Sequence, residues 1–187
     1  MLTPRDEKSL VARSLAGDGR AYAALIEAFS RPVFSLLLRL TANAADSEDL
    51  AQEVFVRAYS GLHTYDPSYP FLNWILTIAH NEGVDWLKAR SRAPLSLDDE
   101  DNPVEVNAPG SDAAQLAEAA WTNEAIWRAT AKLQPPQREA LLLRHKDGLD
   151  YQAIAEVMGL PLGTVKTLIH RGRLALRKEL AGFETFQ

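Results

Sequence analysis

The side chains best suited to hold an anionic partner lie near the end of the sequence, where positive charge gathers without any acid. Between residues 160 and 178 the ionised side chains are Lys166, Arg171, Arg173, Arg177 and Lys178. Cations of one sign along a single element are the usual footprint of binding to nucleic-acid phosphates. The net charge of −5 does not oppose this chemistry, because the acids are concentrated elsewhere and residues 93–127 carry no basic residue.

Two helices and a tight turn are expected to present these cations. Asp150 is a suitable N-cap for a short helix over 151–158, and Gly159 would terminate it. Residues 160–163 then turn the chain into a longer helix from Thr164 to about Leu180. A short helix, a glycine turn and a second helix are typical of a helix-turn-helix.

The apolar residues of this segment indicate how the two helices pack. We expect the first to contact the second closely at Ala155, with Ile154 and Met158 packing against Leu160, Val165 and Ile169. Along the second helix, an inner stripe recurs by steps of three and four residues. Its members are Val165, Ile169, Gly172 and Leu176.

The outer face of the second helix offers two kinds of contact. Side chains near its N-terminal half can reach base edges in the major groove, and flanking cations can hold phosphates. The first group is Thr164, Thr167, Leu168 and Arg171, and the second is Lys166, His170, Arg173 and Arg177. The alternative is a solvated basic helix in an ordinary bundle, which does not explain why turn, short helix and one-signed charge coincide.

A second group of polar side chains lies in the first half of the chain. Asp49, Gln52 and Glu53 stand at i, i+3 and i+4, so they share one helix face. Such a face suits a basic partner surface, although a solvated acidic face is the simpler interpretation of these three residues alone. Leu50, Val54 and Ala58 lie on another face and are expected in the core.

The elements that position the first group begin at the N-terminus. Thr3 followed by Pro4 predicts the start of a first helix, and the Gly-Asp-Gly at residues 17–19 breaks it. Apolar residues recur at helical spacing from 21 to 40, where Pro32 predicts a kink or a break. The acids at residues 46–49 predict the start of the next helix, which runs to about Leu62.

A loop and a further helix follow. Pro67 and Pro70 each lack a backbone donor and predict a loop over residues 63–70. Residues 71–90 are then expected to be helical, with a broad apolar face. That face consists of Phe71, Trp74, Ile75, Ile78, Val84, Trp86 and Leu87.

The middle of the chain differs in composition. Residues 93–112 combine prolines, acids and asparagines with few large apolar side chains, which is typical of a linker. Helices are then expected over 113–133 and, behind two prolines, over 137–146. We therefore predict an all-α fold with two helical domains, residues 1–92 and 119–187, joined by a flexible acidic linker over 93–118.

Several kinds of chemistry are excluded or disfavoured. The chain has no cysteine, so disulfides, thiolate zinc sites and thiol catalysis are excluded. The four histidines are scattered, and neither a nucleophile motif nor a phosphate loop occurs. The acids at 98–101 lack the form of a calcium loop. We expect neither catalysis nor a metal or other cofactor.

The sequence also bears on location. Its first residues lack the apolar core of a signal peptide, and the longest apolar stretch, residues 33–40, is too short to cross a bilayer. A cytoplasmic protein is the expected outcome.

Two segments resemble a known family. Residues 150–166 and 170–173 are similar to region 4 of extracytoplasmic-function sigma factors, a group of the sigma-70 family. Residues 49–59 and 71–75 resemble region 2 of the same proteins. The Gly-Thr-Val-Lys at 163–166 also occurs in response-regulator output domains, but both regions in this order across a linker are far more specific.

The resemblance implies a transcription initiation factor that binds core RNA polymerase and recognises promoter DNA. Asp49, Gln52 and Glu53 would contact the clamp helices of the largest subunit, while the flap of the second-largest subunit is a further expected partner. The minus-35 contacts would be Thr164, Lys166, Thr167, Leu168, His170, Arg171, Arg173 and Arg177. The acidic linker would pass through the polymerase, and an anti-sigma factor is an expected inhibitor.

The resemblance also implies that region 2 opens and captures the minus-10 element, which requires unstacked bases to be held. The matching residues are His63, Tyr65, Asn73, Trp74, Thr77, His80, Asn81, Lys88, Arg90 and Arg92. For Trp74 a core position is at least as well supported, and for His80 and Asn81 the alternative is an ordinary polar surface. Thr77, His80 and Leu168 stand where many family members carry arginine, so the promoter sequence stays open.

Two other functions are weighed against this one. A regulator that binds DNA without polymerase would use the first domain for sensing or dimerisation, and would bind duplex DNA specifically by itself. A sigma factor would bind free DNA weakly and core polymerase tightly. The third alternative, an enzyme, is disfavoured because no catalytic constellation is visible.

Overall fold

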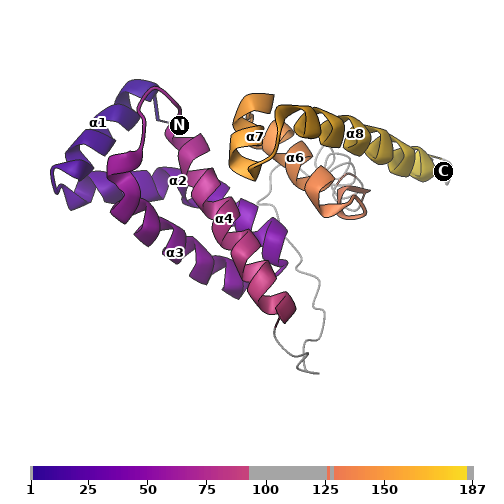
Figure 1. The fold of residues 1–187 in the computed structure, drawn as a ribbon, viewed down its shortest axis with the longest axis horizontal. Helices are drawn as coiled ribbons and strands as arrows, with labels where there is room; N and C mark the ends of the chain where they lie inside the picture. Colours follow the sequence, from indigo (N-terminus) through magenta and orange to yellow (C-terminus); the bar gives the residue numbers. More distant parts are fainter. Residues whose placement is uncertain (1, 93–125, 127–128, 185–187) are drawn as a thin grey trace, which may run out of the picture. The chain divides into compact units, whose positions relative to one another are not determined.

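The computed structural model describes residues 2–92, 126 and 129–184, and within these ranges it contains helices and turns but no strand (Figure 1). The helices are α1 (Pro4–Leu15), α2 (Gly19–Thr41), α3 (Ala44–Gly61), α4 (Phe71–Arg92), α6 (Pro135–His145), α7 (Tyr151–Met158) and α8 (Leu162–Glu184), with a short 3-10 helix η1 (Leu62–Thr64). The all-α prediction is confirmed. The predicted linker and most of the predicted helix over 113–133 lie outside the described residues.

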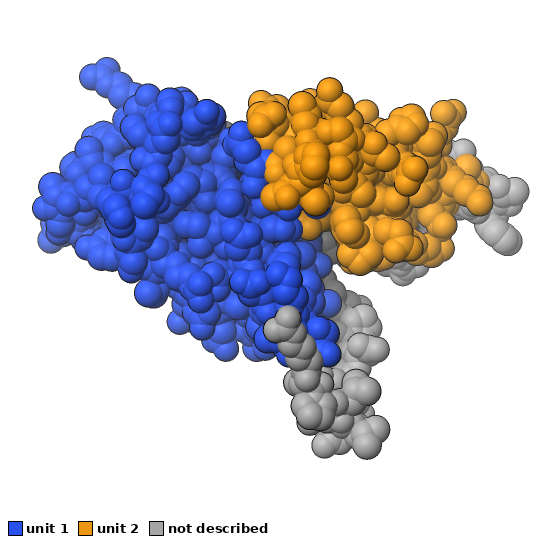
Figure 2. Space-filling model, in the orientation of Figure 1, with its two compact units in different colours: residues 1–104, 156–158 blue, residues 105–155, 159–187 orange. Residues whose placement is uncertain are grey.

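The chain divides into two compact units, which Figure 2 colours separately. One comprises residues 1–104 with 156–158, and the other comprises 105–155 with 159–187. α7 is one continuous helix and is described with α6 and α8.

Side-chain caps fix where the first three helices begin. The Thr3 hydroxyl accepts from the Asp6 backbone N–H at 3.2 Å while the Asp6 carboxylate accepts from the Thr3 backbone N–H, which together form a capping box at the predicted helix start. The Asp18 carboxylate caps α2 by accepting from the backbone N–H groups of Arg20 and Ala21. Asn43 caps α3 through the Asp46 backbone N–H at 3.1 Å, so this helix begins at Ala44, slightly before the predicted acidic start.

Pro32 does not end α2, contrary to one of the two outcomes predicted for it. Proline removes one backbone hydrogen bond inside a helix. Here Phe29 and Val33, which flank Pro32, are both buried in the core and hold the two halves of the helix in place. Tertiary packing therefore offsets the local cost.

α2 is the central helix of the first unit and packs against α1, α3 and α4. Leu25, Val33, Leu36 and Leu37 are completely buried along it. By length and composition alone α2 would be long and apolar enough to cross a membrane. Because α2 has a buried stripe and packs against three helices, it has the features of a core helix.

The helix-turn-helix of the second unit forms much as predicted. α7 spans the predicted residues, and the Asp150 carboxylate accepts from the Ala153 backbone N–H at 2.8 Å. Gly159 adopts φ +62°, and the Leu160 N–H donates to the Ala155 carbonyl at 3.0 Å, which ends the helix. α8 begins at Leu162 rather than Thr164.

α6 begins two residues earlier than predicted, at Pro135 rather than Gln137. The two prolines occupy the first positions of the helix, where a missing N–H costs nothing because it would have no helical partner.

α6 and α8 approach each other most tightly at Gly172. A Cβ built on this glycine would lie 2.8 Å from Leu141 Cδ1 and 3.2 Å from Leu141 Cγ. Val165 and Ile169 of the predicted inner stripe are completely buried beside it. Ala155 is buried as expected. The contact that needs a glycine is the one between α8 and α6, at Gly172.

We expect Gly172→Val to destabilise the second unit by about 1–3 kcal/mol, because the added atoms overpack a filled contact with Leu141. The matched variant is Gly163→Val, since a Cβ on Gly163 meets nothing within 4 Å. Urea denaturation followed by helical circular dichroism measures both midpoints. Equal midpoints for the two variants would contradict the proposed close packing.

Candidate nucleic-acid interface

The outer face of α8 presents nearly all the residues predicted to contact duplex DNA. Seven of the eight predicted side chains are exposed and one, Leu168, is half-buried. The exposed set is Thr164, Lys166, Thr167, His170, Arg171, Arg173 and Arg177. The helix therefore brings together on one element the side chains that sequence spacing assigned to a common surface.

The positive charge of this face is not neutralised within the part of the chain that the structure describes. Lys166, Arg171 and Arg177 form no ion pair with any described residue. Arg173 Nη2 lies 3.4 Å from His145 Nε2, which is not an acid. Glu179, further along α8, is held by Lys132 at 2.9 Å. These cations are available for the phosphates of a partner.

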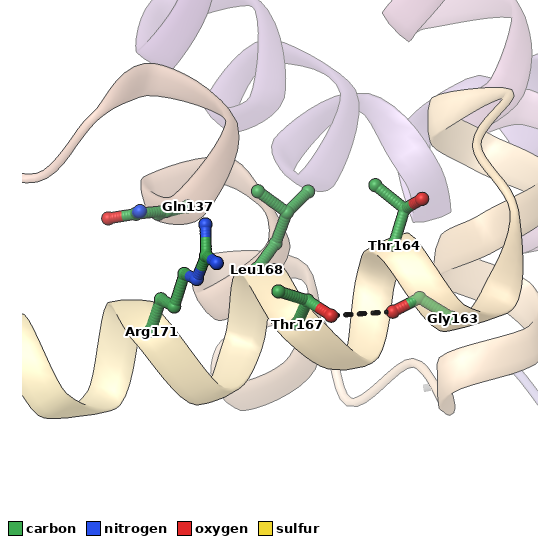
Figure 3. Close-up of a pocket in the computed structure, with 6 residues that line it drawn as sticks. All are labelled: Gln137, Gly163, Thr164, Thr167, Leu168 and Arg171. Atoms are coloured by element: carbon green, nitrogen blue, oxygen red, sulfur yellow. Dashed lines mark hydrogen bonds between the residues drawn. The ribbon is translucent and has the colours of Figure 1, made fainter.

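A hollow of about 300 Å³ opens between α8 and the first turn of α6 (Figure 3). Its lining residues are Gln137, Gly163, Thr164, Thr167, Leu168 and Arg171. The Thr167 hydroxyl donates to the Gly163 carbonyl at 2.9 Å, so this donor is already used within the helix. Gln137 was not predicted, because no spacing within the helix-turn-helix indicates which residue of α6 lies beside it.

The predicted acidic face of α3 is also present in the first unit. Asp49, Gln52 and Glu53 are exposed, whereas Leu50, Val54 and Ala58 are buried as predicted. The same face continues into apolar side chains that the sequence analysis missed. Val56 is 67% exposed, one turn after Gln52, and Tyr59 is 49% exposed.

A groove of about 390 Å³ between α3 and α4 adds further carboxylates beside this face. It is lined by Asp46, Asp49, Leu50, Glu53, Glu82, Asp85, Trp86 and Ala89. Glu82 is buried and pairs with Arg57 at 2.8 Å. Burial raises the pKa of Glu82 although Arg57 acts in the opposite direction. The groove concentrates negative charge where α3 meets α4.

Tyr65 is a core residue, which corrects its assignment to a DNA-facing loop. It is only 8% exposed, and its ring lies 5.3 Å from Phe71 and 5.6 Å from Trp74 between centroids. Its hydroxyl donates to the Tyr69 carbonyl at 2.6 Å. The neighbouring Tyr69 is 55% exposed and His63 is exposed as well, so the loop presents those rings instead.

The residues predicted along α4 divide between surface and core. Asn81, Lys88 and Arg90 are exposed and Asn73, Trp74 and Thr77 are half-buried, while of Arg92 the backbone alone is described. His80 is buried, which corrects the expectation that it faces a DNA strand. The reason is its register: it follows Leu76 by one turn on the stripe that faces α2 and α3.

The cations of α4 differ from those of α8 because they have partners. Lys88 pairs with Asp85 at 3.0 Å. Arg90 lies 3.6 Å from Asp46, and its guanidinium stacks over Trp86 at 5.2 Å from the ring centroid. Binding of phosphates by these two side chains requires the exchange of an existing partner.

Comparison with known proteins identifies the family. A model of sigma-70 region 2 matches residues 25–93 and a model of sigma-70 region 4 matches residues 123–176. The chain is 32% identical over 171 residues to the ECF RNA polymerase sigma factor SigW of Bacillus subtilis (strain 168), covering 88% of this chain and 91% of that protein. It is 31% identical over 176 residues to the ECF RNA polymerase sigma-E factor of Escherichia coli (strain K12), covering 91% and 92%.

Solved structures agree on the fold. The structure of CnrH in complex with the cytosolic domain of CnrY superposes with a TM-score of 0.65 at 22% identity, covering 95% of this chain and 98% of that one. The sigma factor RpoE in complex with the anti-sigma factor NepR from Bartonella quintana gives 0.67 at 20% identity, covering 86% and 96%.

A helix-turn-helix whose Lys166, Arg171 and Arg177 form no ion pair with a described residue is typical of the class of DNA-binding proteins. The chain belongs to the sigma-70 family, in its extracytoplasmic-function (ECF) group. It is thus an alternative transcription initiation factor that directs RNA polymerase to promoters, and the predicted family is confirmed.

Burial raises the pKa of Tyr65 to about 12, and that of Tyr22 likewise to about 12. A phenol whose pKa is higher in the folded state stabilises the fold below its unfolded pKa of roughly 10, and this contribution is lost as pH rises towards 12. We therefore expect the free energy of unfolding to fall between pH 10 and 12. Tyr65→Phe should make that fall shallower, as measured by urea titrations at several pH values, whereas the exposed Tyr69→Phe should leave it unchanged.

Proposed function

We propose that the two units of this sigma factor divide its work, the first binding core polymerase and the minus-10 element and the second binding the minus-35 duplex. The observation that carries this proposal is the contrast between two exposed helix faces. α3 presents Asp49, Gln52 and Glu53, and α8 presents cations without acidic partners among the described residues. Opposite charge on separate units suits one protein partner and one DNA partner.

The proposed partner of the α3 face is the clamp-helix region of the largest polymerase subunit. Carboxylates at Asp49 and Glu53, backed by the groove against α4, favour a basic surface. Val56 and Tyr59 supply exposed apolar area on the same helix. Protein–protein interfaces commonly have an apolar centre surrounded by a polar rim, and these side chains could form that centre. For the second unit we propose a contact with the flap of the second-largest subunit.

For the minus-10 element we propose that α4 and the preceding loop hold the opened strand. Asn73, Thr77 and Asn81 succeed one another by single turns along α4, so they form a polar line. The exposed rings of His63 and Tyr69 are suited to stacking on unpaired bases. Trp74 packs against Tyr65 of the same loop. Lys88 and Arg90 would bind the DNA backbone after exchanging their partners, and Arg92 would bind it as well.

For the minus-35 element we propose that α8 enters the major groove. Thr164, Thr167, Leu168 and Arg171 would face base edges. Lys166, His170, Arg173 and Arg177 would hold phosphates and set the register without reading sequence.

We further propose an anti-sigma factor as the regulator, since two proteins of similar fold were solved with partners, one of which is named as an anti-sigma factor. The chain would act in the cytoplasm, without enzymatic activity and without a cofactor. Within the described ranges no group of three or more potential ligand side chains could hold a metal ion.

Transcription in vitro with purified core polymerase tests the division of labour. Arg171→Ala should lower initiation from the cognate promoter about 5- to 150-fold, because one good base contact contributes about 1–3 kcal/mol. Its capture of core polymerase should be unchanged. Asp49→Ala combined with Glu53→Ala should do the reverse, weakening capture of core polymerase first.

Arg31→Ala, which removes an exposed arginine from α2, is the matched control and should change neither step. If Arg171→Ala and the double variant impaired the same step equally, the division would be wrong. Specific binding of duplex DNA by the free protein, with no capture of core polymerase, would favour a regulator that acts alone.

A further inference from the structure

Gln137 lies beside the exposed face of α8, although it belongs to α6 and not to the helix-turn-helix formed by α7 and α8. A Cβ built on Gly172 would be 3.4 Å from the Gln137 Cβ, so the glycine lets α6 bring this residue against the backbone of α8. Figure 3 shows Arg171 and Leu168 pointing toward the segment that carries Gln137. Gln137 therefore shares the hollow with the residues proposed to read bases.

The hollow presents one apolar side chain, Leu168, and one side-chain amide, Gln137. Leu168 is half-buried and offers methyl groups but no hydrogen-bond donor. Gln137 is half-buried as well, and its side-chain amide makes no hydrogen bond to any residue that the structure describes. The amide of Gln137 can therefore donate one hydrogen bond and accept another, beside the methyl groups of Leu168. A suitable ligand offers a hydrogen-bond acceptor and a donor next to an apolar group.

A thymine·adenine base pair offers this combination in the major groove. Adenine presents N7 as an acceptor and its N6 amino group as a donor, which a glutamine amide matches with two hydrogen bonds. The C5 methyl of thymine in the same pair takes an apolar contact. The positive charge of Arg171, which lines the hollow, and of Lys166 on the same helix favours a DNA occupant over a basic or apolar protein segment.

We propose that Gln137 and Leu168 together determine specificity for one thymine·adenine pair in the minus-35 element, Gln137 binding the adenine and Leu168 the thymine methyl. This inference rests on the proposed function, in which α8 enters the major groove. It adds a specificity-determining residue from α6 and names the base pair that the hollow accepts.

The test uses the full chain bound to core polymerase and a promoter on which the wild type initiates. Templates carry each of the four base pairs at every minus-35 position, and a second set replaces thymine by deoxyuridine, which removes the methyl alone. At one position the wild type should bind the thymine·adenine pair about 5- to 150-fold more tightly than the other pairs. Deoxyuridine should lose part of that preference.

Two variants separate the contributions. Leu168→Ala should bind the thymine and deoxyuridine templates equally at that position. Gln137→Met keeps the size of the side chain but removes the amide, so it should lose the preference for adenine while still distinguishing thymine from deoxyuridine. Gln134→Ala, an exposed residue at the start of α6 that does not line the hollow, should behave as wild type.

Three results would overturn the proposal: an unchanged base preference in both variants, no thymine·adenine preference at any position in the wild type, or weakened capture of core polymerase by Gln137→Met. The last would mean that the hollow faces protein rather than DNA. A wild type that captures core polymerase and initiates normally, with any of these results, leaves the proposed function standing. A wild type that fails to direct initiation at all would refute the proposed function itself.

Discussion

The surface of α8 depends on the contact that α8 makes with α6 around Gly172. The missing side chain there lets Leu141 approach the backbone of α8, and the buried Val165 and Ile169 complete the same stripe. Once this stripe faces inward, the helical period leaves Thr167, His170 and Arg171 facing out. The same contact brings Gln137 of α6 to the edge of the exposed face. One packing interaction thus decides which residues of α8 face outward and which are buried.

Pairing of charges distinguishes the cations of α4 from those of α8. In the first unit, Arg57 is held by Glu82, Lys88 by Asp85, and Arg90 by Asp46 and Trp86. On α8, Lys166, Arg171 and Arg177 have no acidic partner among the described residues. Exposed ion pairs contribute little to stability, so exchanging them for phosphates costs little. In the proposed function, the cations of α8 that lack an acidic partner among the described residues would gain a new anionic partner in a phosphate. Lys88 and Arg90 of α4 would only replace one anionic partner by another.

The sequence was sufficient for the helices of the described residues and for the faces of α3, α7 and α8, because these follow from period and capping within one element. Asp150, Gly159 and the stripe from Val165 to Ile169 are local signals of this kind. Prediction failed where tertiary contacts decide. Position 80 looks polar in the sequence, yet the packing of α4 on α2 and α3 buries His80. Likewise, the place of Gln137 does not follow from spacing, since it depends on how two separate helices meet.

Tyr65 illustrates how a buried residue can serve a surface function in this fold. Its ring packs against Phe71 and Trp74, and its hydroxyl binds the carbonyl of Tyr69, so the loop before α4 is tied to the aromatic core at both ends. These contacts fix the backbone of Tyr69, whose ring is exposed, in the absence of any DNA strand. Ordering in advance lowers the entropy that binding an unpaired base must otherwise offset. In the proposed function, the aromatic core of the first unit would therefore aid DNA binding by ordering this loop rather than by contact, as Gly172 would in the second unit by positioning α8.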